Sequence, residues 1–192
     1  MDIGCGCNIG KNMDYIKNMY NSNIYGIEPR ILAASEERKN GLTIFHGTLD
    51  GYDTTGQFDV IYMLRVTEHL PKPQNTLDQI FKILKSNKKS VIGTPQTNSF
   101  ERYLFKKYWD GWDTPRHMHM FRSKTIQFLL DRSEFDNIDI YYEMHSIYST
   151  IFNNKISKTR NGKPLKIITT INGAINRILK TVFFLLNFRV LC

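Results

Sequence analysis

The sequence predicts an α/β domain, in which a sheet of short buried strands carries helices on both faces. Three features indicate this class. The chain opens with the end of an apolar strand, a glycine-rich turn and the start of a helix, all within residues 1–10. Short apolar strands and helical segments then alternate as far as about residue 142. Polar residues follow the ends of several strands, which is where ligands bind in sheets of this kind.

The composition is that of one folded domain. The 192 residues are 41% hydrophobic and 12% aromatic, which is enough to bury a substantial core. The three cysteines do not suggest a disulfide framework, and we interpret them as free thiols in a reducing, cytoplasmic compartment. We expect neither a signal peptide nor a membrane span, because residue 2 is acidic and no apolar run approaches about 20 residues.

The net charge of +8 is concentrated at the C-terminus. From residue 150 onward there are eight Lys or Arg and no Asp or Glu, so the preceding chain is neutral overall. This distribution argues against a nucleic-acid partner for the whole domain. Residues 171–188 repeat apolar side chains every 3.6 residues after a polar linker at 153–164, which predicts a basic amphipathic helix. That helix either contacts an anionic membrane surface or packs on its own domain or a second subunit.

We therefore divide the chain into a domain over residues 1–150, with an aromatic insert at about 96–122, and a basic tail over 151–192. Apolar spacing predicts helices at 12–20, 31–39, 74–84 and 125–131, the last capped by Ser123. The same reasoning predicts strands at 24–27, 42–45, 58–64, 90–95 and 135–142. Residues 86–89 are expected to form the turn before the fifth strand.

The glycine turn is the first candidate site. Gly4 and Gly6 allow backbone to approach a ligand closely, and the helix that follows directs free N–H groups at the same point. Asp2 places a carboxylate just before the turn, which favours a cationic ligand over a pyrophosphate. Ile9 stands where the dinucleotide fingerprint requires its third glycine, so a nicotinamide cofactor is disfavoured.

The turn resembles motif I of the class I methyltransferases that use S-adenosyl-L-methionine (SAM), whose usual form is Asp-x-Gly-x-Gly-x-Gly. Asp2, Gly4 and Gly6 match this motif, and Asn8 replaces the third glycine. The resemblance implies a Rossmann-like SAM-methyltransferase sheet and a SAM site. Glu28 ends the second strand, 22 residues after Gly6, where such sites hold the ribose hydroxyls; a plain solvated acid is the alternative.

Further cofactor contacts are implied by the same resemblance. Asp50 follows the third strand, in the segment that lies along the adenine in the family. The pattern Phe-Asp-Val-Ile followed by Glu-His-Leu, at 58–61 and 68–70, is similar to motif IV of the branch that includes the ubiquinone-pathway O-methyltransferases. It adds Leu64 and Glu68 to the expected SAM contacts and His69 to the expected catalytic residues, although His69 could instead cap a helix or pack.

The aromatic insert also resembles this branch. Relatives carry a segment shaped like Trp-Asp-x-Pro-Arg-His-x-x-x-Phe, which here runs from Trp112 to Phe121. Such an insert would roof the methyl-donor cleft and shape the acceptor pocket, or else form a small surface subdomain. His117 is the second candidate catalytic residue. His117 and His119 also have a metal-ligand spacing, but without a third or fourth ligand in view we expect no metal.

The resemblance implies methyl transfer to a small-molecule, sugar or lipid-linked acceptor, with oxygen as the expected acceptor atom and His69 or His117 as the expected base. Relatives have more strand residues and a helical segment before motif I, so we expect a chain shortened at its N-terminus. The alternative is a truncated, non-catalytic SAM-fold module that binds a partner or a membrane through its basic tail.

Overall fold

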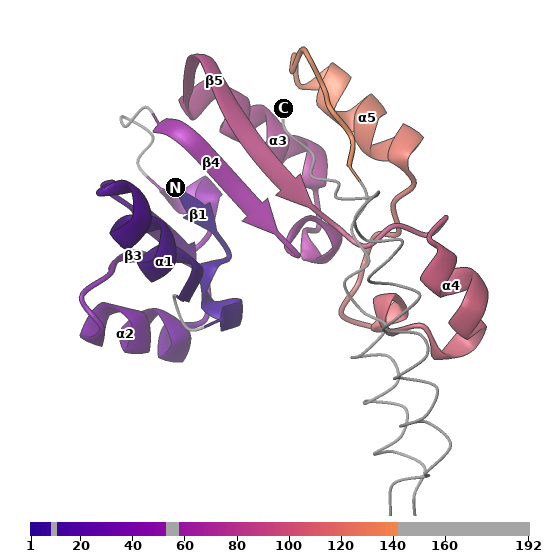
Figure 1. Ribbon diagram of the computed structural model, residues 1–192, viewed down its shortest axis with the longest axis horizontal. Helices are drawn as coiled ribbons and strands as arrows, with labels where there is room; N and C mark the ends of the chain where they lie inside the picture. Colours follow the sequence, from indigo (N-terminus) through magenta and orange to yellow (C-terminus); the bar gives the residue numbers. More distant parts are fainter. Residues whose placement is uncertain (9–10, 53–57, 142–192) are drawn as a thin grey trace, which may run out of the picture.

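The computed structural model describes residues 1–8, 11–52 and 58–141, and their strands form one parallel sheet (Figure 1). Its five strands lie in the order β3-β2-β1-β4-β5, and every neighbouring pair is parallel. They are β1 (Asp2–Ile3), β2 (Tyr25–Glu28), β3 (Thr43–His46), β4 (Phe58–Leu64) and β5 (Leu84–Gly93). The order reverses between β1 and β4, so the carboxyl end of β1 is the switch point where such sheets bind ligands.

Helices connect the strands. The α-helices are α1 (Lys11–Tyr20), α2 (Ile31–Lys39), α3 (Pro73–Ile83), α4 (Phe100–Phe105) and α5 (Ser123–Arg132). Short 3₁₀ turns follow several strand ends: η1 (Cys5–Asn8), η2 (Leu49–Gly51) and η3 (Thr67–His69). Two more, η4 (Lys106–Tyr108) and η5 (Asp110–Trp112), lie in the insert with α4, to one side of the sheet in Figure 1.

Both faces of the sheet are covered, as the sequence predicts. Successive strand residues point to opposite faces. Ile27 of β2 packs in the larger core with side chains of α3 and α5, including Leu77 and Leu130. The adjacent Gly26 faces the smaller core, in which α1 contributes Met13 and α2 contributes Ala34. The predicted α/β class, a Rossmann-like parallel sheet with helices on both faces, is therefore confirmed.

The start of β5 differs from the prediction. The expected turn at residues 86–89 is wrong, because β5 already begins at Leu84. Leu84 pairs with Phe58 and Lys89 with Val60, so the register shifts within this polar stretch, where Asn87 has a φ of 60°. The Nζ atoms of Lys85 and Lys88 lie 3.0 and 3.2 Å from the carboxylate oxygens of Asp59 on β4. These ion pairs join the irregular start of β5 to β4, a contact that the polar composition did not suggest.

Two expectations near α5 are also wrong. Ser123 is the first residue of α5 and not its cap, since Arg122 occupies the N-cap position. The described part of the expected sixth strand, residues 135–141, is not a strand. Glu134 and Asn137 have φ angles of 65° and 52°, which interrupt an extended backbone, and Phe135 instead packs against Phe81 of α3 at 5.3 Å between ring centroids.

The predicted linker and amphipathic helix of residues 151–192 lie outside the described ranges. Within those ranges, no helix combines the length and the apolar character that crossing a bilayer requires.

Candidate active site

The glycine turn lies at the switch point of the sheet. Gly4 has a φ of +77°, a left-handed conformation that favours glycine. Its N–H donates a hydrogen bond to the carbonyl of Ile27 at 2.8 Å, which ties the turn to β2. A Cβ on Gly4 would collide with the Val66 side chain, just after β4. The turn is thus packed between the ends of β2 and β4.

Gly6 is bonded directly to the acid at the end of β2. Its N–H donates to Glu28 Oε2 at 2.8 Å, and a Cβ on Gly6 would collide with this carboxylate. Glu28 is only 1% exposed. The two residues that the resemblance assigns to SAM binding, 22 positions apart in the chain, therefore contact one another.

Arg30 holds the other oxygen of the same carboxylate. Its backbone N–H and its Nε donate to Glu28 Oε1 at 2.9 and 2.8 Å. Burial alone would raise the pKa of Glu28, but the hydrogen bonds from Arg30 and Gly6 outweigh it and hold the pKa below its usual range. Glu28 is consequently a carboxylate at neutral pH. Sequence reasoning missed Arg30, which carries no motif of its own.

Asp2 is buried in β1, between β2 and β4, with 5% exposure. Burial raises the pKa of Asp2 to about 7, and the nearby carboxylates of Glu37 and Glu28 add to the rise. Glu37 on α2 is fully buried and accepts a hydrogen bond from the Cys5 thiol at 3.0 Å. The structure thus places the acidic side chains of Asp2 and Glu37 behind the turn. Nothing in the sequence had indicated that Glu37 would lie there.

Asp50 and Leu64 lie at the ends of two separate strands, β3 and β4, which have β2 and β1 between them in the sheet. Asp50 is exposed on η2, and the Gly47 N–H bonds the Glu28 carbonyl at 3.1 Å, which joins the segment after β3 to the end of β2. Leu64 ends β4, is 41% exposed and lies against Gly93 of β5. Both positions border the carboxyl edge of the sheet.

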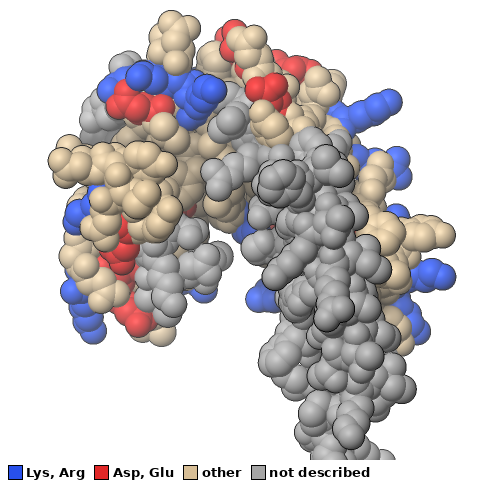
Figure 2. All heavy atoms as spheres, viewed as in Figure 1, with Lys and Arg blue, Asp and Glu red and all other residues tan. Residues whose placement is uncertain are grey.

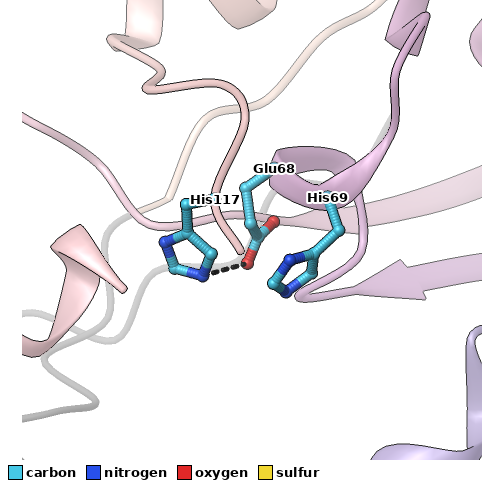
Figure 3. Close-up of side chains that lie close together, drawn as sticks. All are labelled: Glu68, His69 and His117. Atoms are coloured by element: carbon cyan, nitrogen blue, oxygen red, sulfur yellow. Dashed lines mark ion pairs between the residues drawn. The ribbon is translucent and has the colours of Figure 1, made fainter. Parts of the chain in front are cut away.

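A second group of side chains, Glu68, His69 and His117, gathers after β4 (Figure 3). Glu68 is 1% exposed, and its Oε2 accepts a hydrogen bond from the Thr94 hydroxyl at 3.0 Å. Its Oε1 has no hydrogen-bond partner in the described part of the chain and lies 3.9 Å from His117 Nε2. Thr94 was missed by sequence reasoning, although a hydroxyl that follows the end of β5 is a usable signal.

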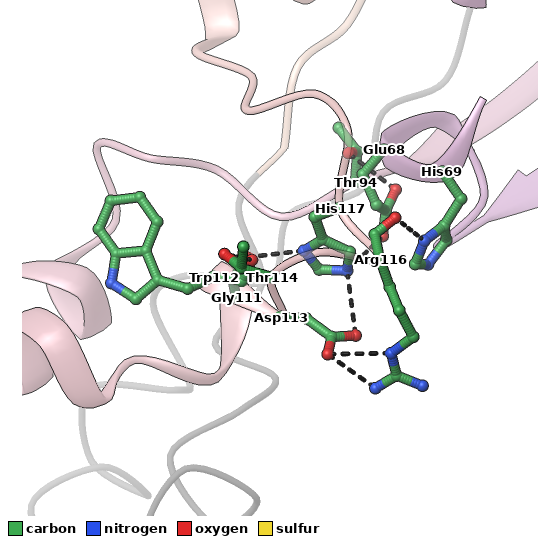
Figure 4. Close-up of polar contacts among 9 residues, drawn as sticks. All are labelled: Glu68, His69, Thr94, Gly111, Trp112, Asp113, Thr114, Arg116 and His117. Carbon is green, nitrogen blue, oxygen red and sulfur yellow. Dashed lines mark hydrogen bonds and ion pairs between the residues drawn. The ribbon is translucent and has the colours of Figure 1, made fainter. Parts of the chain in front are cut away.

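The two histidines are oriented in the same way (Figure 4). Nδ1 of His69 lies 2.9 Å from the carbonyl of Arg116, and Nδ1 of His117 lies 2.7 Å from the carbonyl of Gly111. A carbonyl only accepts, so each Nδ1 carries the proton and each Nε2 is left for chemistry. The ring centroids are 4.7 Å apart, so the two imidazole rings are in direct contact.

Backbone hydrogen bonds fasten the insert to the end of β4. The N–H groups of Met118 and His119 lie 2.8 and 3.2 Å from the carbonyl of Glu68. His119 itself points elsewhere, with its ring stacked on Phe121 at 6.0 Å, so the spacing of His117 and His119 does not form a metal site. The ligand atoms of Glu68, His69 and His117, by contrast, lie within 4.8 Å of one another and could hold a divalent cation.

The chain belongs to a family of methyltransferase domains, since the family profile described as "Methyltransferase domain" matches residues 1–140. This confirms the methyltransferase resemblance at the level of the family. A comparison with curated proteins gave no match.

Solved structures of SAM-dependent methyltransferases share the fold. One from Archaeoglobus fulgidus is 18% identical, with a TM-score of 0.60 over 99% of this chain and 81% of its own. One from Thermotoga maritima, described as a possible histamine N-methyltransferase, is 19% identical, with a TM-score of 0.56 over 74% and 67%. The plantazolicin methyltransferase BpumL, solved with SAH, is 16% identical, with a TM-score of 0.58 over 85% and 70%.

Some of these relatives are considerably longer. The chain spans 61% of a putative methyltransferase solved with the Haloferax volcanii Trm112 activator and 55% of the mycolic acid cyclopropane synthase CmaA1. At sequence identities this low, the structural similarity shows that the fold is shared and nothing more.

Proposed function

We propose that the protein is a SAM-dependent methyltransferase that acts on a hydroxyl group of a small-molecule, sugar or lipid-linked acceptor. The observation that carries this proposal is the contact of Gly6 with the ionised Glu28 at the switch point of a methyltransferase-domain sheet. The residues that would hold SAM are Asp2, Gly4, Gly6, Glu28, Asp50, Leu64 and Glu68.

These residues suit a cationic cofactor that carries a ribose. Gly6 offers backbone without a Cβ beside a carboxylate whose Oε2 has one further lone pair that can accept from a ribose hydroxyl, because Arg30 already donates twice to Oε1. Asp2 and Glu28 make this edge of the sheet acidic, which favours a positively charged ligand. When bound, SAM supplies a methyl group on a positively charged sulfur.

His69 is the proposed proton acceptor. An acceptor hydroxyl loses its proton as its oxygen takes the methyl group, and a base is needed where the pKa of that hydroxyl is high. Because the Nδ1 proton of His69 is committed to the Arg116 carbonyl, its Nε2 lone pair is free to take a proton. His117 Nε2 lies 3.7 Å from Asp113 Oδ2 and 3.9 Å from Glu68 Oε1, so this ring nitrogen faces two carboxyl groups.

Assignment to the ubiquinone-pathway branch, with transfer to oxygen, is supported by the Glu68-His69 pair directly after β4 and by the insert that meets it. Contact of the basic tail with an anionic membrane would bring a lipid-linked acceptor within reach. Vesicle sedimentation of the full chain and of a chain ending at residue 170 tests this contact: binding that persists without residues 171–192 would contradict contact through the predicted helix.

Incubation with methyl-labelled SAM and an extract of the source cell tests the proposed activity. We expect label in a small organic acceptor, and none when Glu28→Ala replaces the wild type. A folded protein that binds SAM but labels nothing would favour the non-catalytic alternative, a SAM-fold module. Absence of SAM binding would contradict the proposal itself.

A further inference from the structure

The insert carries an open cavity at its surface, of about 730 Å³, beside the loop that carries His117. Its volume lies within the range of small-molecule sites, which is about 300–1,000 Å³. Three of its lining residues are cationic and none is acidic. The lining residues are Arg102, Tyr103, Lys106, Lys107, Trp112 and Thr114.

We infer that this cavity binds a phosphoryl or diphosphoryl group of the acceptor. The inference rests on the proposed function, because it names the substrate class of the same enzyme. Three positive charges around one cavity favour an anion that carries more than one negative charge, and phosphate groups do so at neutral pH.

The three cations that line the cavity, Arg102, Lys106 and Lys107, are not ion-paired in the part of the chain that the structure describes. On the neighbouring loop, by contrast, Arg116 is paired with Asp113 at 2.7 Å. Basic side chains also project from the edge of the molecule on which α4 lies (Figure 2). An incoming anion would therefore meet cations without first displacing a carboxylate.

The aromatic side chains hold the guanidinium in place. The Trp112 indole N–H donates to the Lys106 carbonyl at 2.7 Å, which fixes the ring. The guanidinium carbon of Arg102 lies 5.4 Å from the centroid of this ring, within cation–π range. A guanidinium stacked on a fixed ring loses little further freedom when its planar fork binds phosphate oxygens.

The same loop connects the cavity with the histidines. The Gly111 carbonyl bonds His117, and the next residue, Trp112, lines the cavity. In Figure 4 the indole of Trp112 points away from His117, so the loop presents one site on each side. An acceptor held by its phosphate on one side can present a hydroxyl to the other side, which is the positioning that methyl transfer requires.

Titration of the full-length protein with inorganic pyrophosphate, followed by calorimetry at low salt, tests the inference. We expect saturable binding, which Arg102→Gln combined with Lys107→Gln weakens at least about tenfold by removing the charged donors. Arg102→Lys keeps the positive charge but loses the planar guanidinium. Its pyrophosphate affinity should lie between those of the wild type and the double variant. Lys124→Gln, on the exposed face of α5, removes one positive charge outside the cavity and should leave the affinity unchanged.

SAM titration of the same samples separates this inference from the proposed function. Each variant should bind SAM as the wild type does, which also shows that it is folded. Competition by a water-soluble sugar phosphate, or by vesicles that contain phosphatidic acid, then identifies a free or a lipid-borne phosphate. Pyrophosphate binding that is unmeasurable, or that Lys124→Gln weakens as much as the double variant does, overturns the inference whether or not SAM binds.

Discussion

The backbone N–H of Gly6 donates a hydrogen bond to Glu28 Oε2 at 2.8 Å, so the glycine turn and the acid at the end of β2 form one structural unit. The same carboxylate binds Arg30 through its other oxygen. The position of the turn is therefore coupled to the ionised state of Glu28. A substitution at Gly6 should therefore displace Glu28, and a substitution at Glu28 should displace the turn; either should weaken cofactor binding.

Gly6→Ala should weaken SAM binding at least about tenfold, or about 1.4 kcal/mol. The new Cβ would collide with the Glu28 carboxylate and displace the group proposed to hold the ribose. Gly51→Ala is the matched control, because the nearest side-chain atom to its Cβ lies 4.0 Å away. Calorimetric titration of both variants makes the comparison, and equal affinities would show that Gly6 does not border the cofactor.

SAM affinity should rise between pH 6 and pH 8, by about tenfold, and Asp2→Asn should abolish the rise. The pKa of Asp2 is raised to about 7, and a cationic ligand favours the deprotonated carboxylate that forms above this value. The ligand-free protein should behave in the opposite sense. Its free energy of unfolding should fall as pH rises from 3.8 to about 7, since the folded state keeps a proton that the unfolded state has lost. Denaturant titrations across this range, with Asp2→Asn as the reference, measure the second effect.

His69→Ala should lower the turnover number about 100-fold or more while SAM affinity stays unchanged, as expected when a general base is lost. His117→Ala should also lower the turnover number. His119→Ala is the control, because His119 stacks on Phe121 outside the cluster. Assays with and without EDTA separate two roles of the cluster: activity that survives the chelator supports base catalysis, whereas activity that disappears points to a bound cation.

Thr94→Val should reduce the free energy of unfolding by about 1–3 kcal/mol, because it leaves a buried carboxylate without its hydrogen-bond donor. Glu68 is 1% exposed and Thr94 is the donor to its Oε2. Thr125→Val, on the exposed surface of α5, should change the stability far less. Urea denaturation of the wild type and the two variants measures their free energies of unfolding. Similar values for both variants would show that the Thr94 hydroxyl does not stabilise the buried Glu68.

The sequence was most informative where a local pattern carried the function. The glycines of the turn, the acid at the end of β2 and the Glu68-His69 pair could be placed at strand ends from the apolar pattern, and the resemblance to methyltransferase motifs suggested their roles. The fold followed from the same alternation of strands and helices. These features depend on residues that are close together in the chain, which is why they could be recognised without coordinates.

Long-range partners could not be recognised in this way. Nothing in the sequence joins Cys5 to Glu37 or Thr94 to Glu68, since each pair meets only when distant elements pack. The early start of β5 was missed for a related reason: Lys85 is compatible with an exposed turn until Asp59 is placed opposite it. The pairing of His69 with His117, 4.7 Å apart, likewise depends on how the insert returns to the sheet.

The insert is attached to β4 by main-chain atoms, through the N–H groups of Met118 and His119 and the carbonyl of Glu68. Every amino acid except proline can supply such N–H groups, so the attachment does not depend on which side chains the insert carries. Substitutions of side chains in the insert should therefore leave the anchorage of the loop intact. The proposed acceptor site and the proposed cofactor site are thus held by separate contacts, and the first can be altered without disturbing the glycine turn and Glu28.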